Sequence, residues 1–196
     1  CSNWPASAHA AASVSSGGVL LQSSSVLSST AGGLSLSVAI GDGASGFGLT
    51  KLGSGTVTLS GPNSFGGPVI VSAGTLVLAG GAALADTVAV NLDVLGANLT
   101  LQADETIGSL SGAAGTAVTL GSNILSTGDA TSTTYAGVIE GSGGLLKRGS
   151  GKFTLGGANT FTGPVTVGAG TLELAGGSAL ADTVAVSLSA SGATLS

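Results

Sequence analysis

The sequence predicts an all-β protein folded as a parallel β-solenoid, an elongated rod of stacked short strands. Three observations predict this fold. Short apolar stretches alternate with small polar residues, glycine supplies 36 of the 196 residues, and one long segment recurs without a gap. A β-sandwich of this size would normally contain more large aromatic side chains than the 3% found here. At ~20–24 residues a turn, we expect roughly 8–10 turns and a rod about 40–50 Å long.

The recurring segment sets the expected organisation of the chain. It spans Gly48–Thr100 and returns at Gly144–Ser196, a spacing of 96 residues, with 18 of the 53 aligned positions changed. The N-terminal residues resemble a degenerate copy of the spacer 97–143. We therefore expect one continuous solenoid, in which degenerate N-terminal turns at 1–47 precede a first unit at 48–143 and a second, incomplete unit at 144–196.

The expected strands are four or five residues long, and clusters of Gly, Asn, Ser and Pro separate them. Inside each unit apolar residues alternate with small polar ones, as in strands that bury only one face. In chain order the expected strands are 56–59, 68–71, 75–78, 87–90, 98–101, 117–120, 123–126 and 135–139.

Composition excludes several classes of protein. Charged residues make up 7% of the chain, and its only basic residues are Lys51, Lys147, Arg148 and Lys152, too few for a nucleic-acid-binding patch. The mean hydropathy of +0.61 and the net charge of −5 exclude disorder driven by charge. No apolar run approaches the ~18 residues of a membrane helix, so we expect no transmembrane segment in this chain.

Few side chains could carry chemistry, and we expect no enzyme activity, catalytic site, metal site or cofactor. His9, the sole histidine, lies in Ala-rich sequence and is expected to be solvated. Asp104 and Glu105 are adjacent, so on a strand they point to opposite faces, unlike a glycosidase pair. A carbohydrate-active β-helix enzyme would need Asp, Lys and Arg clustered along one face.

Three further sites are interpreted structurally. The turn around Asp42 is similar to a calcium-binding turn but lacks the repeated Asp of a carboxylate cage. Asp86 and Asp182 recur at one position of the repeat, where we expect them to cap a turn before a strand. Cys1, the only cysteine, is interpreted as a fragment boundary; a lipid-bearing residue is the alternative.

The segments Gly53–Leu78 and Gly149–Leu174 resemble the autotransporter-associated β-strand repeat, also called the passenger-associated transport repeat. Two departures are mild: the motif's aromatic is Phe in both copies, where Tyr is commoner, and Pro68 and Pro164 replace the usual Gly or Thr. The residues of the structural repeat motif are Gly53, Gly55, Asn63, Phe65, Gly67 and Gly74 in the first copy and Gly149, Gly151, Asn159, Phe161, Gly163 and Gly170 in the second.

The resemblance implies a right-handed parallel β-helix from the passenger of a secreted bacterial surface protein, located extracellularly or on the cell surface. It also implies a parent protein with an outer-membrane β-barrel. The expected function is structural and adhesive, with a host or surface ligand as partner. The alternative is a self-assembling filament subunit, whose partner is another copy of the chain stacked end to end.

Overall fold

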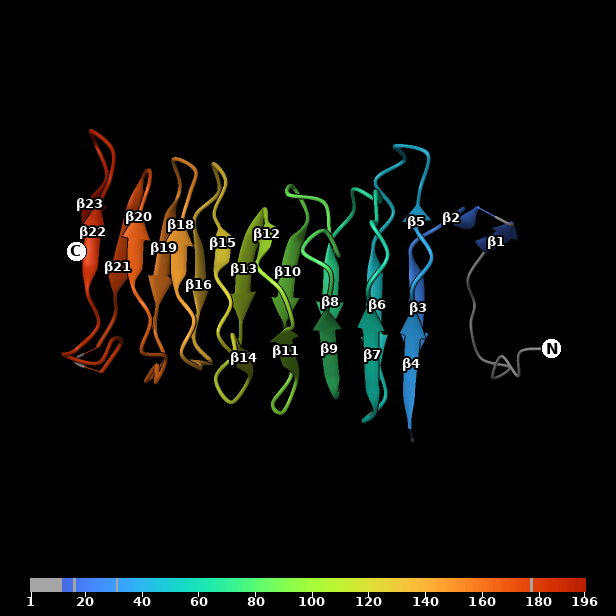
Figure 1. Cartoon of the computed structure of the whole chain (residues 1–196), viewed down its shortest axis with the longest axis horizontal. Helices are drawn as coiled ribbons and strands as arrows, with labels where there is room; N and C mark the ends of the chain where they lie inside the picture. The colour runs from blue at the N-terminus through green and yellow to red at the C-terminus, as the bar shows by residue number, and fades with distance from the viewer. Residues whose placement is uncertain (1–11, 16, 31, 177) are drawn as a thin grey trace.

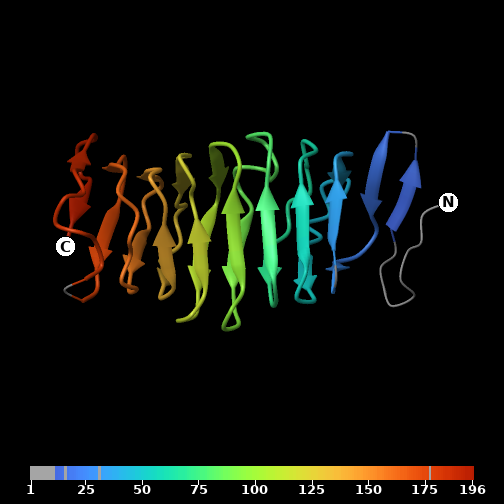
Figure 2. The same ribbon diagram turned by 60° about the horizontal axis from the view of Figure 1, so that its bottom comes forward.

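The computed structural model is an all-β solenoid of about nine turns, which confirms the predicted fold class. The structure describes residues 12–196 except 16, 31 and 177, so Cys1 and His9 lie outside the described residues. Strands stack side by side along the long axis of the rod, and the first and last described strands lie at opposite ends of it (Figure 1; Figure 2). The described residues contain no helix that could cross a membrane.

Three parallel sheets form the sides of the rod. Face I has nine strands: β3 (Ser25–Ser28), β6 (Leu49–Leu52), β8 (Val69–Val71), β10 (Ala89–Leu92), β13 (Ser109–Gly112), β16 (Thr133–Tyr135), β19 (Lys152–Leu155), β21 (Thr171–Leu174) and β23 (Thr194–Leu195). Face II has six: β4 (Gly33–Leu36), β7 (Thr56–Leu59), β9 (Thr75–Leu78), β11 (Asn98–Leu101), β14 (Ala117–Thr119) and β17 (Val138–Glu140). Face III has five: β12 (Glu105–Ile107), β15 (Leu125–Thr127), β18 (Leu145–Lys147), β20 (Val165–Val167) and β22 (Val186–Leu188).

The N-terminal end departs from the parallel stack. There β1 (Ala12–Ser15) pairs antiparallel with β2 (Gly18–Leu21), and β2 pairs parallel with β5 (Ile40–Gly41). Ile40 lies on the side of the rod that later carries face III. Hydrogen bonds join Ile40 to Asn63, Asn63 to Ala83 and Ala83 to Glu105, and Glu105 is the first residue of β12 on face III.

The core is a continuous apolar column inside the rod. In β7 and β11 the burial alternates strictly along the strand, with the aliphatic side chain inward and the polar one outward. Parallel pairing in register places like residues above one another, as in the buried row Leu49, Val69, Val90 and Leu110. Burying one such side chain stabilises the fold by ~1.5–3 kcal/mol, so the stabilisation is distributed along the rod.

The predicted strands at 56–59, 75–78 and 98–101 coincide with β7, β9 and β11. The expected single strand at 135–139 is divided between β16 and β17. The division falls where the chain leaves face I for face II, and Gly137 packs so closely there that a Cβ would lie 2.3 Å from Thr116 Oγ1. The pattern of apolar residues did not reveal this turn, because Ala136 and Gly137 interrupt it by only two residues.

The two copies of the repeat begin on different faces. The first copy starts with β6 on face I, and its 96-residue counterpart starts with β18 on face III. From β6 the chain makes four complete turns to β16, passes face II at β17, and only then reaches β18. The 96-residue repeat of the sequence therefore does not correspond to a whole number of solenoid turns.

Candidate functional site

The Asn residues of the repeat motif join three successive turns. Asn63 is 6% exposed; its Oδ1 accepts the backbone N–H of Ile40 at 2.7 Å, and its Nδ2 donates to the carbonyl of Ala83 at 2.7 Å. Ile40 belongs to the turn before and Ala83 to the turn after. The side chain thus replaces the backbone ladder on a side of the turn that has no strand.

Asn159 makes the same pair of bonds in the second copy. Its Oδ1 accepts from Ile139 N at 2.8 Å, and its Nδ2 donates to Ala179 O at 2.7 Å. Since Ile139 lies in β17, Asn159 occupies the face II side, whereas Asn63 occupies the side of face III. The two Asn residues therefore do not stack on one another.

The other motif residues shape the turns around these bonds. Phe65 and Phe161 are 0% and 1% exposed and pack within the apolar core. Gly74 and Gly170 have φ values of 62° and 65°, and a Cβ on either would come within 2.6 Å of a carbonyl of the preceding turn. The remaining motif glycines also meet neighbouring backbone where a Cβ would point; they are Gly53, Gly55, Gly67, Gly149, Gly151 and Gly163.

Two lysines, which in the sequence are only scarce positive charges, are buried in the rod. Lys51 is 1% exposed, and its Nζ donates to the carbonyls of Leu52 at 3.0 Å, Gly53 at 2.7 Å and Ala73 at 2.9 Å. Three carbonyls satisfy all three N–H donors of the ammonium, which is what a buried charge without a carboxylate needs. Burial lowers the pKa of the Lys51 ammonium.

Lys147 repeats the arrangement of Lys51 at a distance of 96 residues. Its Nζ donates to the carbonyls of Arg148, Gly149 and Ala169, the last two at 2.8 and 3.2 Å, and burial lowers its pKa as well. Ala169, like Ala73, belongs to the following turn. The signal available in the sequence was that half of the basic residues occupy one aligned position.

Glu105 is a buried carboxylate that also joins turns. It is 3% exposed and accepts the N–H groups of Ala83 and Leu84 at 3.2 and 2.9 Å. Burial raises its pKa, while these two hydrogen bonds act in the opposite direction. Asn63 and Glu105 therefore hold the strand-free segment at Ala83 from both sides along the rod.

The carboxylate of Asp42 organises its own turn. It accepts N–H groups of Ala44, Phe47 and Gly66, at 3.0, 3.0 and 3.1 Å. The bond from Gly66 is the largest cause of its lowered pKa. Its oxygens are thus engaged by backbone donors of two turns, which is a structural use of this acidic residue.

The recurring Asp residues are exposed. Backbone bonds from Val88 N to Ala85 O and from Val184 N to Ala181 O close the turns that contain Asp86 and Asp182. The carboxylate of Asp86 lies 4.0 Å from the guanidinium of Arg148. The turns expected at these positions are present, and the backbone itself closes them.

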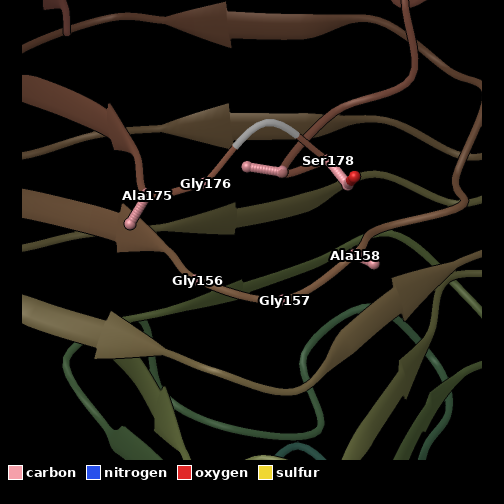
Figure 3. A pocket seen from close by; sticks show the side chains of 7 residues that line it. Gly156, Gly157, Ala158, Ala175, Gly176 and Ser178 are labelled. Atoms are coloured by element: carbon pink, nitrogen blue, oxygen red, sulfur yellow. The ribbon is translucent and has the colours of Figure 1, made fainter.

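No arrangement with the geometry of a catalytic centre emerges from the described residues. Among them, no group of three or more His, Cys, Asp or Glu side chains is placed to hold a metal ion. A hollow of about 220 Å³ near the C-terminal end is lined by Gly156, Gly157, Ala158, Ala175, Gly176, Ser178 and Ala179. Figure 3 shows these residues from close by. Ser178 contributes the only side-chain polar group of that lining, so the hollow has no acid, base or cation to recognise a ligand.

Comparison with known proteins identifies the repeat. The sequence model of the passenger-associated-transport-repeat family matches residues 49–78 and 145–174. Each matched stretch begins with the strand that carries the buried lysine, β6 or β18, and ends three strands later with β9 or β21, at Leu78 or Leu174. No solved structure matches the chain.

A curated relative points the same way. Over 131 residues the chain is 37% identical to the "Adhesin BmaC autotransporter" of Brucella suis biovar 1 (strain 1330). The aligned region covers 64% of this chain but only 4% of the relative. Neither comparison supports the filament alternative. Both imply a location on the cell surface or outside the cell. The chain thus has a β-solenoid fold, two segments that match the passenger-associated-transport-repeat model, and similarity to a short part of an autotransporter adhesin.

Proposed function

We propose that this chain is a structural segment of an autotransporter-type passenger, a rod whose exposed surface contributes to adhesion. The parent protein would carry an outer-membrane barrel, and the ligand would lie on a host or other surface. The similarity to an autotransporter adhesin and the two passenger repeats support the proposal. We propose no catalysed reaction for the rod, because its buried charged side chains all bind backbone groups; they are Asp42, Lys51, Glu105 and Lys147.

The observation that carries the proposal is how the two copies of the repeat differ. Nineteen of the 21 buried positions in the first copy keep their residue in the second. The exceptions are Val57, which becomes Phe153, and Val77, which becomes Glu173. Of the 18 positions that differ, 16 are partly or fully exposed in the first copy. The interior is therefore one reused scaffold, while the outer surface is free to vary, as a scaffold for recognition requires.

Adhesion of coated beads tests the proposal. Beads carrying the purified chain at matched density are flowed over epithelial cells and over bare glass, and the retained fraction is counted. The comparison is with beads carrying a variant in which six partly or fully exposed positions of the second copy take the residue of the first: L146T, R148L, K152T, T166I, E173V and S187N. Circular dichroism verifies that both chains are equally folded.

The proposal expects the chain to raise bead retention over uncoated beads and the surface variant to change it. If a folded chain leaves retention at the level of uncoated beads on both surfaces, the adhesive part of the proposal is wrong. If the chain shows a substantial helical signal instead of a single β minimum, the structural part is wrong.

A further inference from the structure

Equivalent positions of the two repeats lie on different faces of the rod. Thr56 begins β7 on face II, but its counterpart Lys152 begins β19 on face I. The strand-free stretch containing Asn63 lies on the side of face III, and the stretch containing Asn159 lies on the side of face II. Every matched element is displaced by one face in the same direction.

The spacer between the repeats produces this displacement. In most of the first repeat each turn has strands on faces I and II. In the second repeat each turn has strands on faces III and I. Between them, from β11 to β17, all three faces carry strands. The 96 residues of one unit therefore cover four turns and two thirds of a fifth, or about 21 residues a turn, instead of a whole number of turns.

Exposed positions that differ between the copies occur on every side of the first copy. In the first copy Thr50 and Ile70 belong to face I, Thr56 and Asn98 to face II, and Ser64 to the side of face III. All five are partly or fully exposed, and all five change in the second copy. No single face gathers the variable residues.

We propose that the 96-residue unit advances around the rod as well as along it, so that equivalent surface positions of successive units point in different directions. This inference rests on the proposed function as a recognition scaffold and describes how that scaffold presents its surface. One unit rises about 22 Å, at ~4.8 Å a turn. Three units would complete a structural period of about 14 turns, or ~67 Å, before one position faces the same way again. The rod then has no dedicated adhesive face.

Disulfide trapping between neighbouring turns tests this placement. In the displaced arrangement Lys152 stacks beside Ser132 on face I, where Ser132 Oγ accepts the Lys152 N–H at 3.2 Å. If a unit were a whole number of turns, Lys152 would occupy the face II row of its counterpart Thr56, beside Val138. Adjacent strands lie about 4.8 Å apart, within the Cα separation a disulfide spans.

Three pairs are made in the full chain with Cys1→Ser: S132C/K152C, V138C/K152C and T56C/T75C. Each is oxidised with copper phenanthroline and analysed on non-reducing gels and by peptide mass mapping. The inference expects S132C/K152C to close and V138C/K152C to stay open. Closure of V138C/K152C with S132C/K152C open would overturn it. Both of these pairs closing equally, or neither closing, would also overturn it.

The third pair separates this inference from the proposed function. Thr56 and Thr75 are register partners on face II, within one copy of the repeat. They are neighbours in any parallel solenoid built from this repeat, whatever the displacement between copies. T56C/T75C should therefore close in both arrangements. Its failure to close would refute the parallel scaffold itself.

Discussion

A few polar side chains replace missing backbone pairing, and they act singly. A turn of this rod has three sides but often only two strands, so its third side lacks a backbone ladder. Asn63 supplies both an acceptor and a donor there, and Lys51 supplies three donors to carbonyls at the turn between faces I and II. Asn is suited to the first role because one amide carries both kinds of group. Aspartate could accept from Ile40 but could not donate to Ala83.

Replacing Asn63 with Ala should therefore destabilise the rod. The change leaves the Ile40 N–H and the Ala83 carbonyl without their partner, at about 1–3 kcal/mol for each buried group. The matched control is Asn91→Ala, because Asn91 is partly exposed on face I and bonds only the hydroxyl of Ser111. Urea unfolding followed by circular dichroism measures both, and equal shifts in the two midpoints would contradict the assigned role of Asn63.

Tyr135 predicts a loss of stability at alkaline pH. Burial, the main cause, raises the pKa of its phenol from 10.0 to about 12. The Thr116 hydroxyl donates to the phenol oxygen at 3.2 Å, which acts in the opposite direction. A raised folded-state pKa means that the stabilisation is complete below pH 10 and falls as the pH rises toward 12. Two pKa units correspond to about 2–3 kcal/mol.

Urea midpoints between pH 9 and pH 12 test this for the wild type and for Tyr135→Phe. The difference between the two proteins isolates the contribution of the phenol, because both proteins carry the same lysines. We expect the wild type to lose more stability than the Phe variant over this interval. Parallel pH profiles would show that Tyr135 does not contribute.

Among the elements of the fold, the glycine turns between strands decide where one face ends and the next begins. Gly74 precedes β9 with a φ of 62°, and an added Cβ would lie 2.5 Å from the carbonyl oxygen of Gly55 in the preceding turn. Two constraints thus coincide: a left-handed backbone and contact with the neighbouring turn. The spacing of these glycine turns sets the strand length, because three or four residues fit between one turn and the next.

Gly74→Ala should consequently destabilise the protein by about 2 kcal/mol or more, since strain and backbone contact add. Gly66→Ala is the control: a Cβ there meets nothing within 4 Å, and the second copy carries Thr162 at this position. Thermal melts of the two variants provide the measurement. A melting temperature reduced equally in both would show that neighbouring backbone does not restrict position 74.

Over the whole molecule, stability is the sum of turns stacked on their neighbours. Among the described residues nearly all strand pairing is parallel, and strands pair only with strands of neighbouring turns. A single aromatic-rich core is unnecessary, because each turn contributes its own inward aliphatic residues. The rod should therefore tolerate the loss of a complete turn better than the loss of part of one.

Two deletions examine this property. Residues 90–109 form one turn, since Val90 and Leu110 are register partners. Removing them should preserve a cooperative unfolding transition, because the remaining strands of faces I and II join in register. The midpoint should be lower, because the N–H groups of Ala83 and Leu84 lose Glu105 as their acceptor. Removing residues 90–99, half as many, should abolish the transition. The two are compared by circular dichroism melts, and a half-turn deletion as stable as the full-turn deletion would contradict additive stacking.

Much of this architecture is predictable from sequence, and the limits have physical causes. Alternation marks strands such as Thr56–Leu59 because one face is buried and the other is not. The motif Asn and Phe positions are visible because they recur. Burial of Lys51 and Glu105 is not predictable from residue type, since an isolated charge gives no indication of three carbonyls or two N–H donors converging on it. The face on which a repeat lies depends on the summed lengths of all preceding turns, so similarity between copies cannot reveal it.

Burial of two lysines also determines where a protease that cleaves after basic residues can cut the folded rod. The chain has four such residues, and folding withdraws Lys51 and Lys147 from the surface. Arg148 and Lys152 alone keep about half of their side chains exposed, and they lie within five residues of each other. Trypsin-like digestion of the intact rod is therefore confined to one short stretch, where a cut would leave two long pieces still joined by the strand pairs on either side.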